Sequence, residues 1–529
     1  MRRRSFLAGA AAALAAPGIT APRIAVAQAA RVLKFVPQSD LGILDPIWSQ
    51  AYVTRNHGLM IFDTLYGMDD QFRISPQMLE GDLAEEDGRL WTLTLRDGLK
   101  FHDGAPVLGR DCVASIRRWG ARDSFGQTLL AFTDELTAPD DRSIRFRLKH
   151  AFPLREALGK PGSNICAIMP ERLAATDPFK QVPELIGSGP FLFKPDQRVV
   201  GSLVVYERNP AYVPRGGGTP SFTSGPKIVH FDRVEWHVLP DPATAAAALQ
   251  LGEVDWWENP LFDLLPVLRR DPNIAVAVQD TTGLIGIQRM NHLQPPFNNP
   301  ALRRAVLGAV NQTDFMTAVA GADRSAWRDG VGMFCPDTPM ASDAGMAALM
   351  GPRDLERVKR DVAASGYKGE RVVLLVPSDF PVLKAMGDVG ADMLQKCGLN
   401  VDYQNLDWGT VLQRVAKMEP VEQGGWSVFH TYWSGLDMLN PAVNSSLRAN
   451  GKSAGRGWPT SPALEGLRDQ WLLATDLAEQ KRLASSIQQQ AFDDVPYIPL
   501  GQIRAPTAYR RRIKDVLGGF SIFWNVKPA

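Results

Sequence analysis

The pair His102-Asp103 is the first set of side chains along this chain that could do chemistry. It lies in WTLTLRDGLKFHDGAPVLGRDC, residues 91–112, between two Asp-Gly turn dipeptides. A His–Asp pair supports hydrolysis only when a nucleophile lies beside the imidazole. The chain contains no G-x-S-x-G, H-E-x-x-H or Walker sequence. We therefore interpret the pair as part of a turn, and expect no catalytic residues and no enzymatic activity.

The cysteines and histidines do not suggest a metal site. The four cysteines are widely spaced and fit no zinc motif: Cys112, Cys166, Cys335 and Cys397. An oxidising compartment would permit disulfides in three alternative pairings. Buried free thiols are nevertheless favoured, since Cys397 falls on the apolar face of an expected helix. We expect no metal and no cofactor.

The richest candidate stretch for binding a ligand runs from residue 405 to residue 444. Within 26 residues it holds four large aromatic side chains: Trp408, Trp426, Tyr432 and Trp433. Trp426 falls in an expected strand, where alternation buries one face, so we assign it to the core. Trp433 precedes Ser-Gly, where the strand opens into a loop, and such loops carry binding groups. We expect Trp433 and Trp408 to offer apolar faces to a ligand.

Residues 1–29 have the pattern of an export signal: a triple-arginine start, an Ala-rich apolar run and Ala-x-Ala exits. The run RRSFL resembles the twin-arginine signal, whose route carries folded proteins. Removal of the segment changes the net charge from +1 to −3, because 54 basic residues remain against 57 acidic ones. The chain has no nucleic-acid motif, and no other apolar run approaches the roughly 20 residues of a membrane span. We expect a soluble, exported protein with no nucleic-acid partner.

Apolar periodicity indicates an α/β chain. Residues 32–36, 91–95 and 144–148 are expected to form strands, and residues 110–122 a helix. Residues 371–403 read as strand, helix and strand, which predicts a βαβ unit and hence a piece of parallel sheet. Three further helices carry start signals at Asp241-Pro242, Ser461-Pro462 and Asp476, the last with Glu479 as a capping box.

Short motifs in a constant order give nearly the whole mature chain a family resemblance. The chain resembles the peptide/nickel-type (family 5) extracytoplasmic solute-binding proteins of ABC transporters at FDTLY (62–66), RDGLKFHDGAP (96–106), GSGPF (187–191), ERNPAY (207–212), GEVD (252–255), residues 291–309 and DVPYIPL (494–500).

The resemblance implies a two-lobed fold of the periplasmic-binding-protein type II-like class (cluster C), with an extra β-rich subdomain inserted in lobe I. Lobe I would comprise residues 30–52, 187–282 and the C-terminal return 496–529. The inserted subdomain would span residues 53–186, and lobe II residues 283–495. The crossover strands between the lobes are expected near residues 281–288 and 496–502.

The resemblance also implies site residues in the cleft between the lobes. The W-x-G stretch at Trp433 would look into the cleft, next to Tyr432. In peptide-binding relatives an aspartate directly after W-x-G pairs with the peptide's α-amino group. Here that position is Leu436, with Asp437 following, so either the loop absorbs a one-residue offset or the amine site is absent.

A facing loop of the first lobe, residues 39–52, would supply apolar contacts from Trp48 and Tyr52. Trp48 could equally pack under that loop. Nickel-chelate relatives use a histidine in the cleft, but the single His430 is more consistent with a structural imidazole.

The function implied by the resemblance is that of a solute-binding receptor for an ABC importer. The receptor would bind a peptide or peptide-like solute in the cleft by hinge closure and deliver it to the permease. The expected partners are this ligand and the membrane subunits of the permease, and the protein is expected to be a periplasmic monomer. Two alternatives remain: a binder of a metal chelate or haem-like ligand on the same scaffold, and a secreted hydrolase.

Overall fold

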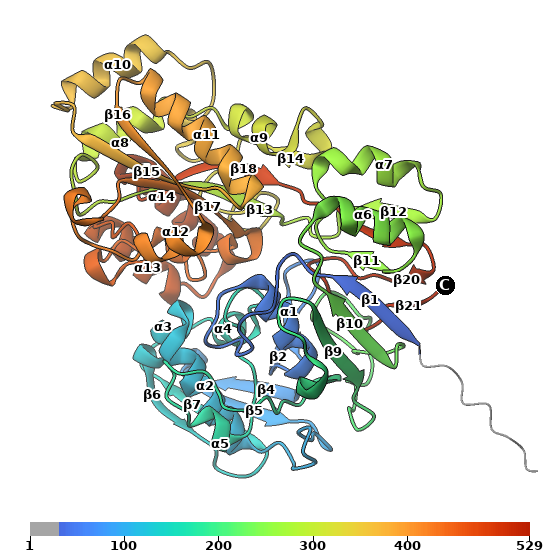
Figure 1. Ribbon diagram of the computed structural model, residues 1–529. Coiled ribbons are helices and arrows are strands. Elements are labelled where there is room, and N and C mark those ends of the chain that lie inside the picture. Colours follow the sequence, from blue (N-terminus) through green and yellow to red (C-terminus); the bar gives the residue numbers. More distant parts are fainter. Residues whose placement is uncertain (1–30) are drawn as a thin grey trace, which may run out of the picture.

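Two lobes, each built on its own mixed sheet, make up the molecule (Figure 1). The computed structural model describes residues 31–529, so the expected export signal lies outside these residues. The α/β class follows the prediction. In the described part of the chain, no helix combines the length and the apolar character needed to span a membrane.

The sheet of the first lobe has seven strands in the order β12-β19-β11-β1-β10-β9-β8. Its centre is β1, Val32–Val36, which pairs in parallel with β10 and β11 and buries Leu33 and Phe35 completely. Segments from the start, the middle and the end of the chain therefore meet in one sheet. The other strands are β8 (Phe191–Phe193), β9 (Leu203–Arg208), β10 (Arg233–His237), β11 (Trp256–Trp257), β12 (Ile274–Ala277) and β19 (Thr507–Arg510).

A separate antiparallel sheet, β4-β5-β7-β6, forms between β1 and β8 (Figure 1). Strands β5 (Leu90–Leu95) and β7 (Ser143–Leu148) confirm the two strands predicted from alternating residues. The predicted helix is α2 (Gly109–Arg122), and it packs on this sheet. The remaining elements of the region are α1 (Tyr52–Ile61), β2 (Tyr66–Met68), β3 (Ile74–Pro76), β4 (Leu79–Glu85), α3 (Ser124–Phe132), β6 (Thr133–Thr137), α4 (Leu154–Gly159) and α5 (Glu171–Ala174).

His102 serves this region as a structural residue. Its backbone N–H donates to the Gly187 carbonyl at 2.8 Å, and its Nε2 lies 3.2 Å from the Gly189 carbonyl oxygen. Burial lowers the pKa of His102 to about 4, so the imidazole is neutral at physiological pH. The His-Asp turn thereby holds the Gly-Ser-Gly-Pro turn, which agrees with the interpretation from the sequence.

The sheet of the second lobe has six strands in the order β14-β18-β13-β17-β15-β16. The predicted βαβ unit is confirmed: β15 (Arg371–Pro377) and β16 (Asn400–Leu406) pair in parallel and flank α11 (Pro381–Lys396). The other elements are β13 (Leu284–Met290), α8 (Pro300–Leu307), α9 (Gln312–Ala320), β14 (Trp327–Arg328), α10 (Leu355–Ala364), α12 (Trp408–Arg414), β17 (Val428–Ser434), α13 (Pro462–Leu473), α14 (Leu477–Asp494) and β18 (Ile498–Ile503).

Two crossovers join the lobes. The first runs from β12 to β13 through residues 278–283, and the second from β18 to β19 through residues 504–506. The expected return to the first lobe at residue 496 is therefore too early. Strand β18, the fully buried run IPLGQI, pairs with β13 and β14 and therefore belongs to the second lobe.

The predicted helix starts are present. Asp241 caps α6 (Pro242–Leu251) by accepting from the Thr244 N–H, and Ser461 caps α13 by accepting from the Leu464 N–H. Asp476 caps α14 as expected, but the reciprocal half of the capping box is replaced, since Glu479 pairs with Arg482 instead. All four cysteines are buried free thiols, as favoured from the sequence.

Candidate ligand site between the lobes

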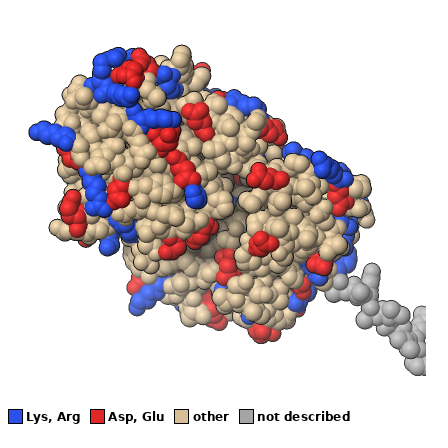
Figure 2. Space-filling view, turned by 45° about the horizontal axis from the view of Figure 1, so that its top comes forward, with Lys and Arg blue, Asp and Glu red and all other residues tan. Residues whose placement is uncertain are grey.

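A cavity of about 70 Å³ lies between the two crossovers, where the lobes meet. The space-filling view shows the surface hollowed between the lobes, with acidic side chains close to the hollow (Figure 2). Both lobes and the first crossover contribute to the cavity wall through Tyr52, Arg55, Glu258, Asp280, Ser434 and Phe520. A ligand that fills this space would contact both lobes at once.

Asp437 connects the lobes by hydrogen bonds. It lies just after β17 of the second lobe and is 6% exposed. The Tyr52 hydroxyl donates to Asp437 Oδ2 at 3.0 Å, and accepts from the Ser434 N–H at 2.5 Å. The Ser163 N–H and Oγ donate to Asp437 Oδ1 at 2.9 and 3.0 Å. Since Tyr52 and Ser163 belong to the region between β1 and β8, these four bonds hold the lobes together across the cleft.

Helix α1 brings buried charge to the same place. All residues of α1 from Val53 to Ile61 are buried, and they include the charged Arg55 at 5% exposure. The Arg55 guanidinium lies 3.5 Å from the Phe520 ring centroid and 4.9 Å from that of Tyr52. Burial lowers the pKa of Arg55, an effect that nearby carboxylates oppose. The opposite charge beside it is Glu258, whose pKa burial raises.

None of the expected binding aromatics of the second lobe forms part of the cavity wall. Trp408 and Tyr432 are half-buried and flank Phe380, with ring centroids 6.0 and 6.1 Å from it. Burial, and after it the Glu258 carboxylate of the first lobe, raise the pKa of Tyr432. Trp433 is also half-buried and points to the opposite face of β17, as successive strand residues do.

The remaining expected site residues divide between core and cleft. Leu436 is 3% exposed and belongs to the main core. The Trp48 indole N–H donates to the Phe179 carbonyl at 3.1 Å, and Arg122 lies over its ring, so Trp48 packs beside the region of α2. Among the predicted residues, Tyr52 lines the cavity and Asp437 reaches it through Tyr52.

Comparisons with known proteins agree with this architecture. The family model "Bacterial extracellular solute-binding proteins, family 5 Middle" matches residues 73–455. The chain belongs to this family. A relative in Sinorhizobium fredii, named "Probable peptide ABC transporter periplasmic-binding protein", is 36% identical over 100% of this chain and 99% of its own length. The "Probable D,D-dipeptide-binding periplasmic protein" of Escherichia coli is 24% identical over 82% of this chain and 81% of its own.

Solved structures show the same two-lobed fold. A binding protein from A. tumefaciens R10, in complex with agropinic acid, superposes with a TM-score of 0.78 at 19% identity, covering 94% of this chain and 99% of that one. A periplasmic binding protein of Helicobacter pylori, in complex with the peptide STSA, gives 0.76 at 21% identity, covering 94% and 98%.

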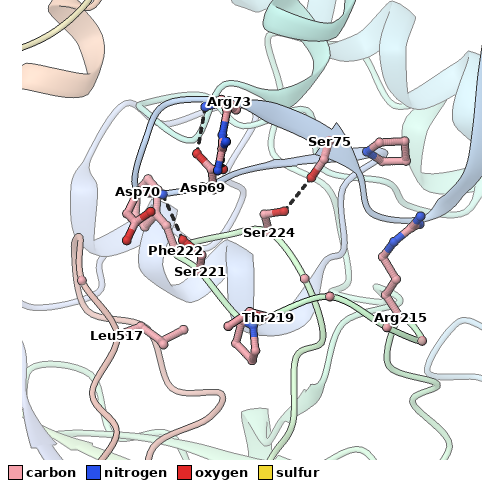
Figure 3. Close-up of a pocket in the computed structure, with 17 residues that line it drawn as sticks. Asp69, Asp70, Arg73, Ser75, Arg215, Thr219, Ser221, Phe222, Ser224 and Leu517 are labelled. Atoms are coloured by element: carbon pink, nitrogen blue, oxygen red, sulfur yellow. Dashed lines mark hydrogen bonds and ion pairs between the residues drawn. The ribbon is translucent and has the colours of Figure 1, made fainter.

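A second, larger cavity of about 720 Å³ lies outside the cleft, in the first lobe (Figure 3). Its wall is formed by the β2–β3 hairpin, the glycine-rich loop 215–225 and residues 517–518. The polar side chains of the wall bond to one another: Arg73 to Asp69, and Ser75 to Ser224. A ligand here would touch one lobe alone, so this cavity cannot couple binding to closure of a family 5 protein.

The side chains that could ligate a metal ion are dispersed over residues 31–529. No group of three or more His, Cys, Asp or Glu side chains in this range is arranged to hold a metal ion. His430 is 1% exposed and pairs with Gln288, and burial lowers its pKa to about 3. It is a neutral core residue between β17 and α11, in agreement with its structural interpretation.

Sequence reasoning missed Arg55, Glu258, Asp280 and Ser163. One signal was available: the run R-N-H interrupts the apolar residues of α1, and charge inside an apolar helix is often functional or paired. No local signal marks Ser163, because its partner Asp437 is 274 residues away.

Proposed function

We propose that this protein is the solute-binding receptor of an ABC importer, which encloses a peptide or peptide-like solute between its lobes and delivers it to the permease. The observation that supports this most directly is the cavity between the crossovers, walled by both lobes and bordered by the Tyr52–Asp437 contact. A solute there stabilises the closed state through contacts that the open state lacks, and the permease recognises the closed state.

The names of relatives support the solute class. The 36% identical relative is named for peptide transport, and the Escherichia coli relative for D,D-dipeptides. One structural neighbour holds agropinic acid, so the panel of test solutes should include opines as well as peptides. These relatives are named periplasmic, which together with the signal-like start supports a periplasmic location.

Asp437, Trp433, Trp408 and Tyr432 are the proposed contacts on the second lobe, with Tyr52 opposite. Leu436 packs in the core and Trp48 packs against Phe179 and Arg122, so neither of these two is retained as a contact. Asp437 is already bonded by Tyr52 and Ser163, so a solute that favours the closed state would bind beside contacts that join the lobes.

The experiment is native mass spectrometry of protein purified from the periplasm without denaturation, followed by small-angle scattering. We expect a co-purified small solute, and a smaller radius of gyration when that solute is added back to emptied protein. An identical scattering profile with and without saturating solute would contradict the closing mechanism. Turnover of the solute by the purified protein would instead favour a hydrolase, and a stoichiometric metal a chelate binder.

A further inference from the structure

We propose that the cavity between the crossovers binds the α-amino-acid head of the solute, with its α-carboxylate on Arg55 and its α-ammonium on Asp280. The inference rests on the proposed function, because the solute must enter the interlobe cleft. It deepens that function by naming a chemical class: solutes that carry both groups on one α-carbon.

Arg55 lacks acceptors that a carboxylate would supply. Its Nε and Nη2 both donate to Asn56 Oδ1, at 3.1 and 3.0 Å, and among residues 31–529 its Nη1 has no hydrogen-bond partner. A guanidinium carries five donors, and Nη1 of Arg55 is not among the buried unpaired atoms, so an acceptor from outside can still reach it. The rings of Tyr52 and Phe520 hold the guanidinium plane, so the fork is already oriented for a planar acceptor. Because Arg55 forms part of the cavity wall, a carboxylate in the cavity can supply that acceptor.

Asp280 offers the complementary acceptor on the first crossover. Its Oδ1 accepts from the Thr282 N–H at 2.9 Å and from Thr282 Oγ1 at 2.6 Å, whereas its Oδ2 has no partner in the described part of the chain. Glu258 differs, because its two oxygens already accept from the Gln38 N–H at 2.7 Å and from Asn56 Nδ2 at 2.8 Å. Of the two carboxylates in the wall, Asp280 is the one free to receive an ammonium.

The charge of the wall favours a zwitterion. One guanidinium faces two carboxylates, Glu258 and Asp280, so the wall has an excess of one negative charge. A solute with only a carboxylate would add to that excess, and one with only an ammonium would leave Arg55 without its acceptor. An α-amino-acid head satisfies both groups and leaves the total charge unchanged.

The size of the cavity limits what enters. A volume of about 70 Å³ is several times the roughly 10–15 Å³ that one water molecule needs. It accommodates a head group, and the rest of a larger solute must extend out of the cavity into the cleft. The class therefore includes large free amino acids and γ-linked peptides. An α-linked peptide falls outside it, since its ammonium and its terminal carboxylate are on different residues.

The test compares two probes of identical composition and charge, γ-L-glutamylglycine and α-L-glutamylglycine, by titration calorimetry with the mature protein emptied of solute. Only the γ-linked isomer keeps ammonium and carboxylate on one carbon. We expect it to bind at least tenfold more tightly than the α-linked isomer. Arg55→Lys removes the fork but keeps the charge, and Asp280→Asn removes the charge but keeps Oδ1. Each should weaken binding of the γ-linked isomer by at least tenfold.

Arg303→Lys is the matched control, because Arg303 is a buried arginine of the second lobe that donates to the Phe297 and Asp494 carbonyls. It should shift the melting temperature as Arg55→Lys does, and leave the affinity for the γ-linked isomer unchanged. Equal affinity for the two isomers, a preference for the α-linked one, or no binding of either overturns the head-group assignment. The proposed function fails separately, if no solute of the broad panel changes the scattering profile.

Discussion

The hydroxyl of Tyr52 makes hydrogen bonds that join the two lobes. It donates to Asp437 and accepts from the Ser434 N–H, and both partners belong to the second lobe. Tyr52→Phe removes this oxygen and preserves the ring that lies against Arg55. A hydrogen bond to a charged group contributes about 1.5–3 kcal/mol net. The closed state should therefore lose about 2 kcal/mol relative to the open state, since water replaces the lost partners in the open cleft.

A ligand that binds only the closed state loses this free-energy difference from its apparent binding free energy. We expect the Kd of Tyr52→Phe to rise by roughly 30-fold, because 1.4 kcal/mol corresponds to a factor of ten. Titration calorimetry with the co-purified solute measures it, and scattering of the empty variant should show a larger radius of gyration. Tyr212→Phe is the control: its hydroxyl donates to Asp63 at 2.9 Å, and both residues belong to the first lobe. That variant should lose thermal stability with no change in Kd.

Two results would refute the reasoning. If Tyr52→Phe behaves as Tyr212→Phe does, the hydroxyl stabilises the fold and does not control closure. If Tyr52→Phe binds an amine-bearing solute more tightly than the native protein, Tyr52 competes with the ligand for Asp437, and the bond does not assist closure.

Three further predictions follow from the same site and from buried histidines. Trp433→Ala should weaken solute binding by about 2 kcal/mol or more and leave the melting temperature of the empty protein nearly unchanged; a stability loss of about 3–5 kcal/mol without a separate affinity loss would make it a core residue. If Asp437, and not Asp280, receives the amine of the solute, Asp437→Asn should reduce affinity for solutes with a free amine and spare their N-acetylated forms in calorimetry; equal affinities would exclude an amine contact at Asp437. Burial lowers the pKa of His57 and of His430 to about 3, so below pH 6.5 the unfolded chain binds protons that the folded chain excludes. The free energy of unfolding should thus fall as the pH falls from about 6.5 toward 3, by about 2–4 kcal/mol between pH 7 and pH 5 in urea titrations, whereas identical midpoints would contradict neutral burial.

Local patterns predicted the elements of this fold well. Asp241-Pro242 starts α6 where capping chemistry requires it, and Ser461-Pro462 starts α13. The βαβ unit around α11 was readable because strand, helix and strand follow one another within residues 371–406. Each of these features depends on neighbours in sequence, so that the responsible interactions are visible in a single short window.

The arrangement of the lobes was harder to predict, since it depends on distant partners. Strand β18 is apolar throughout, and such a run fits the core of either lobe; only its pairing with β13 and β14 assigns it to the second. The contact of Tyr52 with Asp437 spans 385 positions. Arg55 would be exposed on an ordinary surface helix, and it becomes a cavity residue only because α1 is covered on all sides.

The position of β19 affects how the molecule can be made. This strand comes from the end of the chain, yet it lies between β12 and β11 in the seven-stranded sheet, and it joins two strands that have no other contact with each other in that sheet. Until residues 507–510 leave the ribosome, β11 and β12 present open edges that can pair with other chains. The first lobe thus begins to form with β1 and finishes last. A nascent or C-terminally truncated chain has a gap inside its sheet, and is exposed to aggregation at that gap for the whole time that the second lobe is being synthesised.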